Sequence, residues 1–471
     1  MLNLNGSAES AVADLVLRGG AVHVLDAAGA RAEAVAVVGG RIARVGSESG
    51  IEGWIGERTR VVELRGRAVI PGINDSHLHA AWLGARWPHT FFGAADPEAA
   101  ARLSGALVTS REERRAAILR AGSLLAELGI TSYTEPGIGP GEDEGETGCF
   151  TSDVLEAYRE LAAEGALRQR VTMLALYGIL DGPSELGVVL AGIAERAEAP
   201  AEPDPRWLNV TGVKIFGDLI PMTRQAWTRH AYDDGSHGAL LVEGDSIEDR
   251  AANLAAMVRA THLAGLQLGV HATGDRTIQL VLDALAAAEA EAGPEAGSVR
   301  ELAHYVIHGD LATEAQLRRM GELGVRLNTQ SGIAALTADW LAGVLGAAAA
   351  EAWRIETALD AGVLVLSSDS PVLGFDWRRG IADAEARIVH AGGADDEASK
   401  RRRLHGLLRA YTAVAAEQDR VAAWKGTVEA GKAADLVVLA RDPYEVGAAG
   451  LPEVEVDLTV LDGRVVFERG A

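Results

Sequence analysis

Cysteine is almost absent from this chain of 471 residues. Cys149 is the one cysteine, so no disulfide can form within the chain, and a small scaffold held together by disulfides is excluded. Basic residues are also outnumbered: 44 lysines and arginines face 67 aspartates and glutamates, which gives a net charge of −23 at pH 7. Because an acidic surface repels phosphate groups, we expect neither nucleic acid nor an anionic membrane as a partner.

Long apolar runs are missing as well. No uninterrupted apolar run reaches the roughly 18 to 20 residues that a membrane span needs. The first residues, MLNLNGSAESAVAD, lack the basic start and the apolar core of a signal peptide. Apolar residues nevertheless make up 48% of the chain and charged residues 24%, the composition of a globular protein with a substantial core. We therefore expect a cytoplasmic protein without a membrane partner.

The two ends of the chain share one texture of short, alternating, β-branched runs. At the N-terminal end these are DLVLRGGAVHVLD, AVAVVGGRIARVG and RVVELRGRAVIPG, and at the C-terminal end GTVEAGKAADLVVLARD and VEVDLTVLDGRVVFERG. The Gly-Gly pairs of the N-terminal runs predict hairpin turns. We predict a small β-sandwich built from residues 1–70 and 425–471, with a large domain, residues 71–424, inserted between its two parts.

Eight apolar strand candidates alternate with helical patterns in the inserted domain. They contain INDSHLH, GITSYTE, RVTMLALYG, TGVKIFGD, LQLGVHATGD, AHYVIHGD, GVRLNTQ and GVLVLSSDS. One predicted helix begins at Asp245, with Glu248 as its capping partner, and another carries an apolar face from Ile278 to Leu285. Eight strand–helix units predict an α/β protein with a (β/α)₈ barrel. A doubly wound open sheet is the alternative.

The segment GIGPGEDEGETG, residues 137–148, is rich in glycine and has no apolar periodicity, which is typical of a loop. Its glycines could suggest a phosphate-binding loop. However, four of its residues are carboxylates, which would repel a phosphate. We therefore predict a plain loop after the second strand of the barrel.

Polar residues recur at the ends of the predicted strands. His77 and His79 follow the first strand and stand two residues apart, so both side chains point to one face. His271 ends the fifth strand, His308 the sixth and Asp369 the eighth. Because barrel enzymes carry their chemistry at the carboxyl ends of the strands, these side chains are expected to converge. Imidazole and carboxylate ligands suit Zn²⁺ or a similar divalent ion.

A lysine and a further histidine lie near this group. Lys214 lies inside the fourth strand among apolar neighbours, where an unpaired ammonium would be costly. His304 shares the strand parity of His308, but a packed histidine is the favoured interpretation there.

Five further residues near the strand ends have two interpretations each. Glu135, after the second strand, is either a substrate contact or support for a site residue, or else a solvated carboxylate. Trp82, Trp87 and His89 follow the first strand and could line an aromatic substrate pocket, although core packing is an equal alternative for the tryptophans. Arg276 either binds a substrate carboxylate or pairs with a neighbouring acid.

Six motifs together resemble the amidohydrolase superfamily: PGINDSHLH, GVKIFGD, HATGDR, HGD, LSSDSPV and GTVEAGKAADLVVL. Within it they are most similar to the YtcJ-like branch, amidohydrolase family 3, which includes N-substituted formamide deformylases. The resemblance spans nearly the whole chain and implies two divalent metal ions, Zn²⁺ first, with Mn²⁺, Fe²⁺ or Co²⁺ as alternatives.

The resemblance also assigns ligands to each ion. His77 and His79 would bind one ion together with Asp369, and His271 and His308 would bind the other. Lys214 would be carboxylated on its amine, giving an N6-carboxylysine that bridges the two ions.

The function implied by the resemblance is hydrolysis of a C–N bond in a small amide, N-formyl, N-acyl or cyclic amide compound. Asp369 would move the proton from the attacking water to the leaving nitrogen. A homodimer or larger homo-oligomer is expected, as is common in the family. A deaminase of the same fold and a binding barrel without catalysis are the alternatives. Members that deaminate usually carry a glutamate shortly after the fifth strand, where HATGD offers Asp275.

Overall fold

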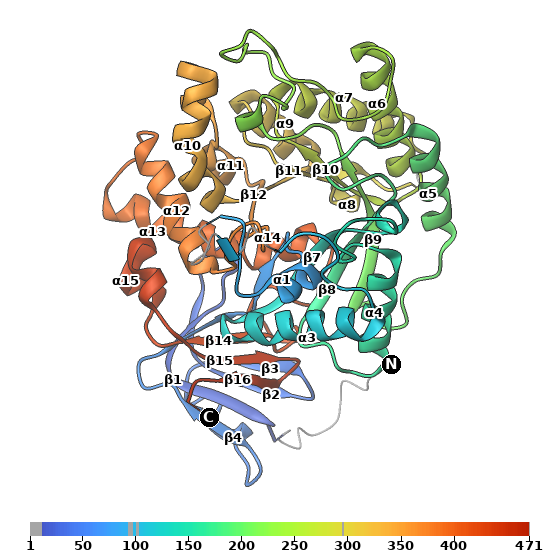
Figure 1. Ribbon diagram of the computed structural model, residues 1–471. Helices are drawn as coiled ribbons and strands as arrows, with labels where there is room; N and C mark the ends of the chain where they lie inside the picture. The colour runs from blue at the N-terminus through green and yellow to red at the C-terminus, as the bar shows by residue number, and fades with distance from the viewer. Residues whose placement is uncertain (1–11, 93–97, 100–102, 294–295, 471) are drawn as a thin grey trace.

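The protein is described by a computed structural model that covers residues 12–92, 98–99, 103–293 and 296–470. Residues 1–11 lie outside this range, so the expectation about a signal peptide falls largely outside the described residues. Two eight-stranded sheets organise the chain. One is the parallel sheet of a barrel, and the other is a mixed sheet below it in which strands from both ends of the chain lie side by side (Figure 1).

The barrel strands pair in parallel and in chain order. They are β6 (Ile73–Asp75), β7 (Ile130–Ile138), β8 (Arg170–Leu176), β9 (Leu208–Phe216), β10 (Gln267–Ala272), β11 (Tyr305–His308), β12 (Arg326–Thr329) and β13 (Leu364–Leu366). A parallel bridge between Leu78 and Ser370, beyond the ends of β6 and β13, nearly closes the ring. All eight predicted strands are present, so the (β/α)₈ prediction is confirmed and the doubly wound alternative is wrong.

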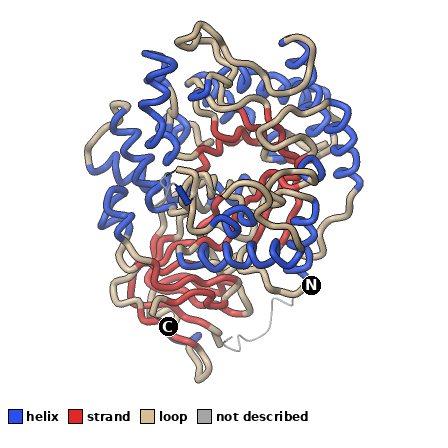
Figure 2. Tube along the Cα trace, viewed as in Figure 1, coloured by secondary structure: helices blue, strands red, loops and turns tan. Residues whose placement is uncertain are grey.

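Helices surround the barrel (Figure 2). The main ones are α1 (Ala80–Arg86), α3 (Arg111–Glu127), α4 (Ser152–Ala163), α5 (Leu186–Glu198), α6 (Ile247–Leu263), α7 (Asp275–Glu291), α8 (Val299–Leu302), α9 (Glu314–Leu323), α10 (Ser331–Leu345), α11 (Ile355–Asp360), α12 (Trp377–His390), α13 (Glu397–Ala410) and α14 (Ala413–Gln418). The predicted apolar face of α7, from Ile278 to Leu285, is buried as expected. The predicted start of α6 is off by one residue, because Ser246 is the N-cap and its hydroxyl accepts a hydrogen bond from the Asp249 amide.

The barrel interior is packed with apolar side chains and is closed at one end by polar contacts. Leu174 of β8 packs with Tyr305 and Ile307 of β11 across the barrel interior. At the amino ends of the strands, the interior is closed by the residues that end α14: Asp419 accepts hydrogen bonds from Asn74 (2.7 Å) and Thr134 (2.8 Å). This polar network stabilises one end of the interior and leaves the carboxyl ends of the strands for the site.

The mixed sheet has the strand order β16-β15-β14-β5-β1-β2-β3, with β4 paired to β1. Its strands are β1 (Leu15–His23), β2 (Arg31–Val38), β3 (Arg41–Gly46), β4 (Arg60–Glu63), β5 (Ala68–Pro71), β14 (Leu436–Leu439), β15 (Val456–Leu461) and β16 (Arg464–Glu468), and α15 (Pro443–Gly450) lies between β14 and β15. The predicted association of strands from both termini is therefore confirmed, in the form of one mixed sheet. The boundaries drawn at residues 70 and 424 stay predictions.

The glycine pairs of the N-terminal strands play two different parts. Gly39 and Gly40 connect β2 and β3 as a predicted hairpin turn, with φ angles of 55° and 77°. Gly19 and Gly20 instead lie inside β1, where the pairing with β2 shifts register, so a hairpin turn there is wrong. The physical reason is close packing: a Cβ on Gly20 would lie 2.2 Å from the Arg67 carbonyl oxygen.

Two further predictions concern loops and membrane spans. The segment 137–148 is a loop apart from the end of β7 and the single turn η2 (Pro140–Glu142), as predicted.

The stretch Ser331–Glu351 is a helix long and apolar enough to cross a membrane by length and composition, although Asp339 interrupts it. The core helix of a soluble protein passes the same test, so the prediction about a membrane stays untested.

Candidate metal centre

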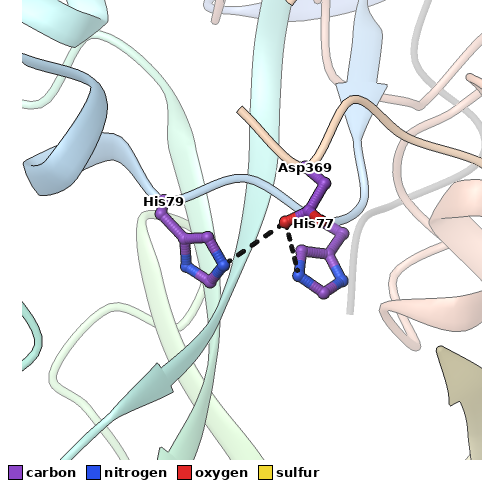
Figure 3. Close-up of side chains that lie close together, drawn as sticks. All are labelled: His77, His79 and Asp369. Carbon is purple, nitrogen blue, oxygen red and sulfur yellow. Dashed lines mark ion pairs between the residues drawn. The ribbon is translucent and has the colours of Figure 1, made fainter. Parts of the chain in front are cut away.

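His77, His79 and Asp369 form a compact buried group at the carboxyl ends of the first and last barrel strands (Figure 3). The Oδ1 atom of Asp369 lies 3.2 Å from Nε2 of His77 and 3.5 Å from Nε2 of His79. One ligand atom from each residue lies within 4.8 Å of the other two. Two imidazoles and a carboxylate at this spacing can hold one divalent metal ion.

Backbone hydrogen bonds bring these residues together from opposite ends of the barrel sequence. The Asp369 amide donates to the His77 carbonyl, and the His79 amide donates to the Ser370 carbonyl, both at 2.8 Å. Asp369 and His308 have φ angles of 57° and 69°, in the left-handed region that non-glycine residues seldom adopt. Such strained backbone persists where the surroundings hold it, and it is concentrated at functional sites.

Glu135 orients His79. Its Oε1 lies 2.8 Å from Nδ1 of His79, while its Oε2 accepts a hydrogen bond from the Ala80 amide at 2.7 Å. A carboxylate on the second ring nitrogen is the usual partner of a metal-binding histidine. Glu135 is fully buried, so the solvated interpretation is wrong. With both oxygens engaged, its position favours support of His79 over contact with a substrate.

The second predicted half of the site lies beside the first. The ring centroid of His308 is 5.4 Å from that of His77 and 4.5 Å from that of His271. Phe216 stacks on His271 with centroids 5.2 Å apart, and the Lys214 Nζ atom lies 4.7 Å from the Phe216 centroid. The structure therefore brings all six predicted residues to one region. Within the described residues, His77, His79 and Asp369 are the ones whose ligand atoms lie close enough together, within 4.8 Å, to hold a single ion.

Two residues that sequence reasoning missed support the second half. Gln330 follows β12, and its Oε1 lies 2.6 Å from Nδ1 of His308. Asp218 accepts hydrogen bonds from the Thr273 and Gly274 amides at 2.9 Å, and its Oδ1 lies 3.8 Å from Nδ1 of His271. Asp218 belongs to the quoted motif GVKIFGD. Gln330 could have been suspected only because it follows the seventh strand.

The donor set fits a metal ion. Among the residues that the structure describes, the buried Nδ1 atoms of His77 and His271 have no hydrogen-bond partner. Burial lowers the pKa of His77 well below its usual value, that of His271 to about 4 and that of His308 to about 3. These imidazoles are therefore neutral near pH 7, and neutral imidazole is the form that binds metals. Residues of both predicted halves can hold a divalent ion.

Three further groups in this region, His79, Asp369 and Lys214, have shifted pKa values. Burial lowers the pKa of His79, but its bonds to Asp369 and Glu135 outweigh this and raise it to about 9. Burial raises the pKa of Asp369, but the neighbouring His77 and the other imidazoles outweigh it and hold that pKa well below its usual range. Burial lowers the pKa of Lys214 to about 8, and Asp369 offsets only part of this effect. A substantial neutral fraction of the Lys214 amine follows near neutral pH.

The aromatic residues predicted after the first strand separate in the structure. Trp82 lies beside the site: its ring centroid is 6.1 Å from that of His79 and 5.3 Å from that of Phe150. Trp87 is 40% exposed and its ring lies near Phe375. Within the described residues, neither Trp87 nor His89 has a ring contact or ion pair with a metal-facing side chain, so their place in a substrate pocket stays a prediction.

Two more predicted residues lie outside the group. The Arg276 guanidinium lies 5.6 Å from the ring centroid of Trp227, while the adjacent Asp275 pairs with Arg229 at 3.3 Å. Within the described ranges Arg276 forms no ion pair, so both interpretations of Arg276, a substrate contact and a pair with an acid, stay predictions. His304 is a packed residue, as favoured, because its ring nitrogens bond to His262 and to the Leu268 amide at 3.0 Å.

The sequence profile of the amidohydrolase family, Amidohydro_3, matches residues 92–467. The chain belongs to the amidohydrolase family. It is 24% identical to the N-substituted formamide deformylase of Arthrobacter pascens, over 97% of this chain and 98% of that protein. It is also 24% identical to LONG AFTER FAR-RED 3 of Arabidopsis thaliana, over 92% and 88% of the two chains.

Solved structures with the same fold include two uncharacterized metal-dependent hydrolases. The one from Pyrococcus furiosus has a TM-score of 0.69 and 20% identity, and the comparison covers 91% of this amidohydrolase and 99% of that chain. The one from Pyrococcus horikoshii OT3 has a TM-score of 0.68 and 19% identity, with 92% and 99% covered. The chain thus combines the sequence of the amidohydrolase family with a buried group, His77, His79 and Asp369, that could hold a metal ion.

Proposed function

We propose that this amidohydrolase cleaves a C–N bond next to a carbonyl in a small molecule: an amide, an N-formyl or N-acyl compound, or a cyclic amide. The observation that carries the proposal is the convergence of His77, His79 and Asp369 at 3.2 and 3.5 Å. The full-length similarity to a protein named as an N-substituted formamide deformylase supports the bond type.

The residues of the site have separate roles in this proposal. His77, His79 and Asp369 would hold one divalent ion, and His271 and His308 a second, with Zn²⁺ as the first candidate. When bound, such ions supply Lewis acidity that makes water more acidic and the carbonyl more electrophilic. Asp369 takes a proton from the attacking water and returns it to the leaving nitrogen, as general base and then general acid.

Lys214 is proposed to be carboxylated. Its neutral amine would add CO₂, so that an N–C bond forms and one proton is released, leaving an anion where an ammonium would be costly. The lowered pKa of Lys214, about 8 because of burial, makes that neutral amine available. The carbamate oxygens could serve both ions, which would connect the two halves of the site.

The test is the metal content per chain by elemental analysis, after purification without added metal or chelator. We expect about two ions in the wild type, fewer in Lys214→Ala, and the wild-type value in Lys400→Ala, a control lysine that is 40% exposed. Formate, carboxylate and amine release from a panel of formamides, N-acyl compounds and cyclic amides then tests the bond type.

Other results would change the proposal in defined ways. One ion in both the wild type and Lys214→Ala would remove Lys214 from the site and favour a deaminase, which ammonia release from amino-substituted heterocycles would reveal. No ion even after supplementation would contradict hydrolysis and favour a binding barrel. A cytoplasmic location and a homo-oligomeric state also remain proposals.

A further inference from the structure

A large cavity lies away from the metal centre, between α4 and α5. Its volume is about 1130 Å³, and apolar side chains dominate its lining. The floor consists of Ala175 and Tyr177, at and after the end of β8, and of Leu208 and Val210 of β9. Cavities that bind small molecules are typically about 300–1000 Å³, whereas most voids in protein interiors are no larger than a water molecule.

The cavity is on the outer side of the barrel. Leu174 points into the barrel, where it packs with Tyr305 and Ile307. Successive residues of a strand point to opposite faces, so Ala175 points outward, towards the helices. Ala175, Leu208 and Val210 accordingly belong to the apolar core between the strands and the helices. The cavity is thus separate from the group of His77, His79 and Asp369.

The helix α5 contacts the floor at one glycine. A Cβ on Gly192 would lie 2.2 Å from ring atoms of Tyr177, so the helix rests directly on this ring. Arg196 is four residues further on, on the same face of α5, and also lines the cavity. Tyr177 and Arg196 therefore line the same cavity, and the Arg196 charge acts on the Tyr177 hydroxyl, whose pKa it lowers against the larger effects of burial and Glu195.

Both of these groups have unused hydrogen-bonding capacity. Within the part of the chain that the structure describes, the buried Nε atom of Arg196 has no partner, and its Nη2 makes long contacts to the Ala199 and Pro200 carbonyls, at 3.4 and 3.3 Å. The Tyr177 hydroxyl forms no hydrogen bond within the described residues. The other arginine of the cavity, Arg159, is engaged differently: it pairs with Glu202 at 2.8 Å and with Glu156 at 2.6 Å.

We propose that this cavity binds a small amphipathic monocarboxylate, with its apolar part on the floor and its carboxylate on Arg196 and the Tyr177 hydroxyl. A guanidinium matches the two oxygens of a carboxylate, and a pair removed from water is stronger than one on the surface. The exposed Glu195 lies next to Arg196 and disfavours a second negative charge on the ligand. The binding of this ligand does not depend on the metal ions or on the proposed reaction.

The test is isothermal titration calorimetry of the full-length protein with three probes of equal chain length: octanoate, octan-1-ol and octylamine. We expect one octanoate per chain, bound at least tenfold more tightly than the alcohol or the amine. Arg196→Gln should reduce octanoate affinity to that of octan-1-ol, whereas Arg168→Gln, on an exposed arginine, should leave it unchanged.

A second variant tests the location. Ala163→Trp, at the exposed edge of the cavity on α4, should block both octanoate and octan-1-ol, while Ala335→Trp on the exposed face of α10 should not. Thermal unfolding of each variant controls for folding.

Three results would overturn the proposal. One is octanoate that binds no better than octan-1-ol, and another is unchanged binding in Ala163→Trp. The third is loss of both ligands in Arg196→Gln with unfolding unchanged, since the alcohol does not need the guanidinium.

Discussion

The two halves of the metal centre are built in different ways. His77, His79 and Asp369 come from the first and last barrel strands, and backbone hydrogen bonds of 2.8 Å join the segments that carry them. His271 and His308 come from neighbouring strands, and side chains support them: Gln330 for His308 and Asp218 near His271. The first half therefore brings three ligand atoms within 4.8 Å of one another in the closed barrel. The second half requires a further ligand, the role proposed for Lys214.

The largest expected effect comes from removing a ligand of the first half. His77→Ala should lower the metal content by at least one ion and reduce amide hydrolysis by about a thousandfold or more, because the activated water is lost. His271→Ala should remove one ion and leave the ion of the first half in place. Elemental analysis and product release on the two variants measure this difference. Equal loss of both ions in the two variants would show that the halves assemble only together.

The residues that support the ligands should give an intermediate effect. Glu135→Gln removes the charge that faces His79 Nδ1, and the loss of such a partner typically costs 10- to 100-fold in metal affinity. Gln330→Ala removes a neutral partner from His308, and we expect a smaller loss there. Competition with a chelator at a series of concentrations measures both affinities. A larger loss in Gln330→Ala would reverse the ranking of the two halves.

The smallest expected effect concerns the stability of the metal-free protein. Its dependence on pH should differ between His308, in the second half of the site, and His79, in the first. Burial depresses the pKa of His308 to about 3, against about 6.5 when unfolded. The unfolded chain then binds more protons below pH 6.5. The contribution of His308 to the free energy of unfolding is therefore complete above pH 6.5. It falls with pH, by about 2 kcal/mol at pH 5.

His79 should behave in the opposite way. Burial lowers its pKa, but bonds to Asp369 and Glu135 outweigh this and raise it to about 9. The contribution of His79 to the free energy of unfolding is therefore complete below pH 6.5 and is lost as the pH rises through 9. Urea unfolding of chelator-treated wild type, His79→Gln and His308→Gln between pH 5 and 9.5 measures both slopes. The comparison fails if His308→Gln unfolds with the same pH dependence as the wild type.

Local patterns predicted more of the barrel than of the small sheet. Apolar runs between helical segments identified all eight barrel strands, and strand parity placed His77 and His79 on one face. The same rules misplaced Gly19 and Gly20, because a glycine pair in a register shift has the same local pattern as one in a hairpin. The contact that distinguishes the two pairs, the Arg67 carbonyl against Gly20, lies far away in the sequence.

The sequence by itself determined the order of strands and helices and the residue types at the strand ends, because alternation and capping act over a few neighbouring residues. Only the tertiary structure decided that Glu135 holds His79, that Gln330 holds His308, and that Arg276 lies over Trp227. The cavity between α4 and α5 is likewise a feature that only the tertiary structure decided. Such contacts join residues far apart in the chain, and they depend on how closure of the barrel orients whole strands and helices.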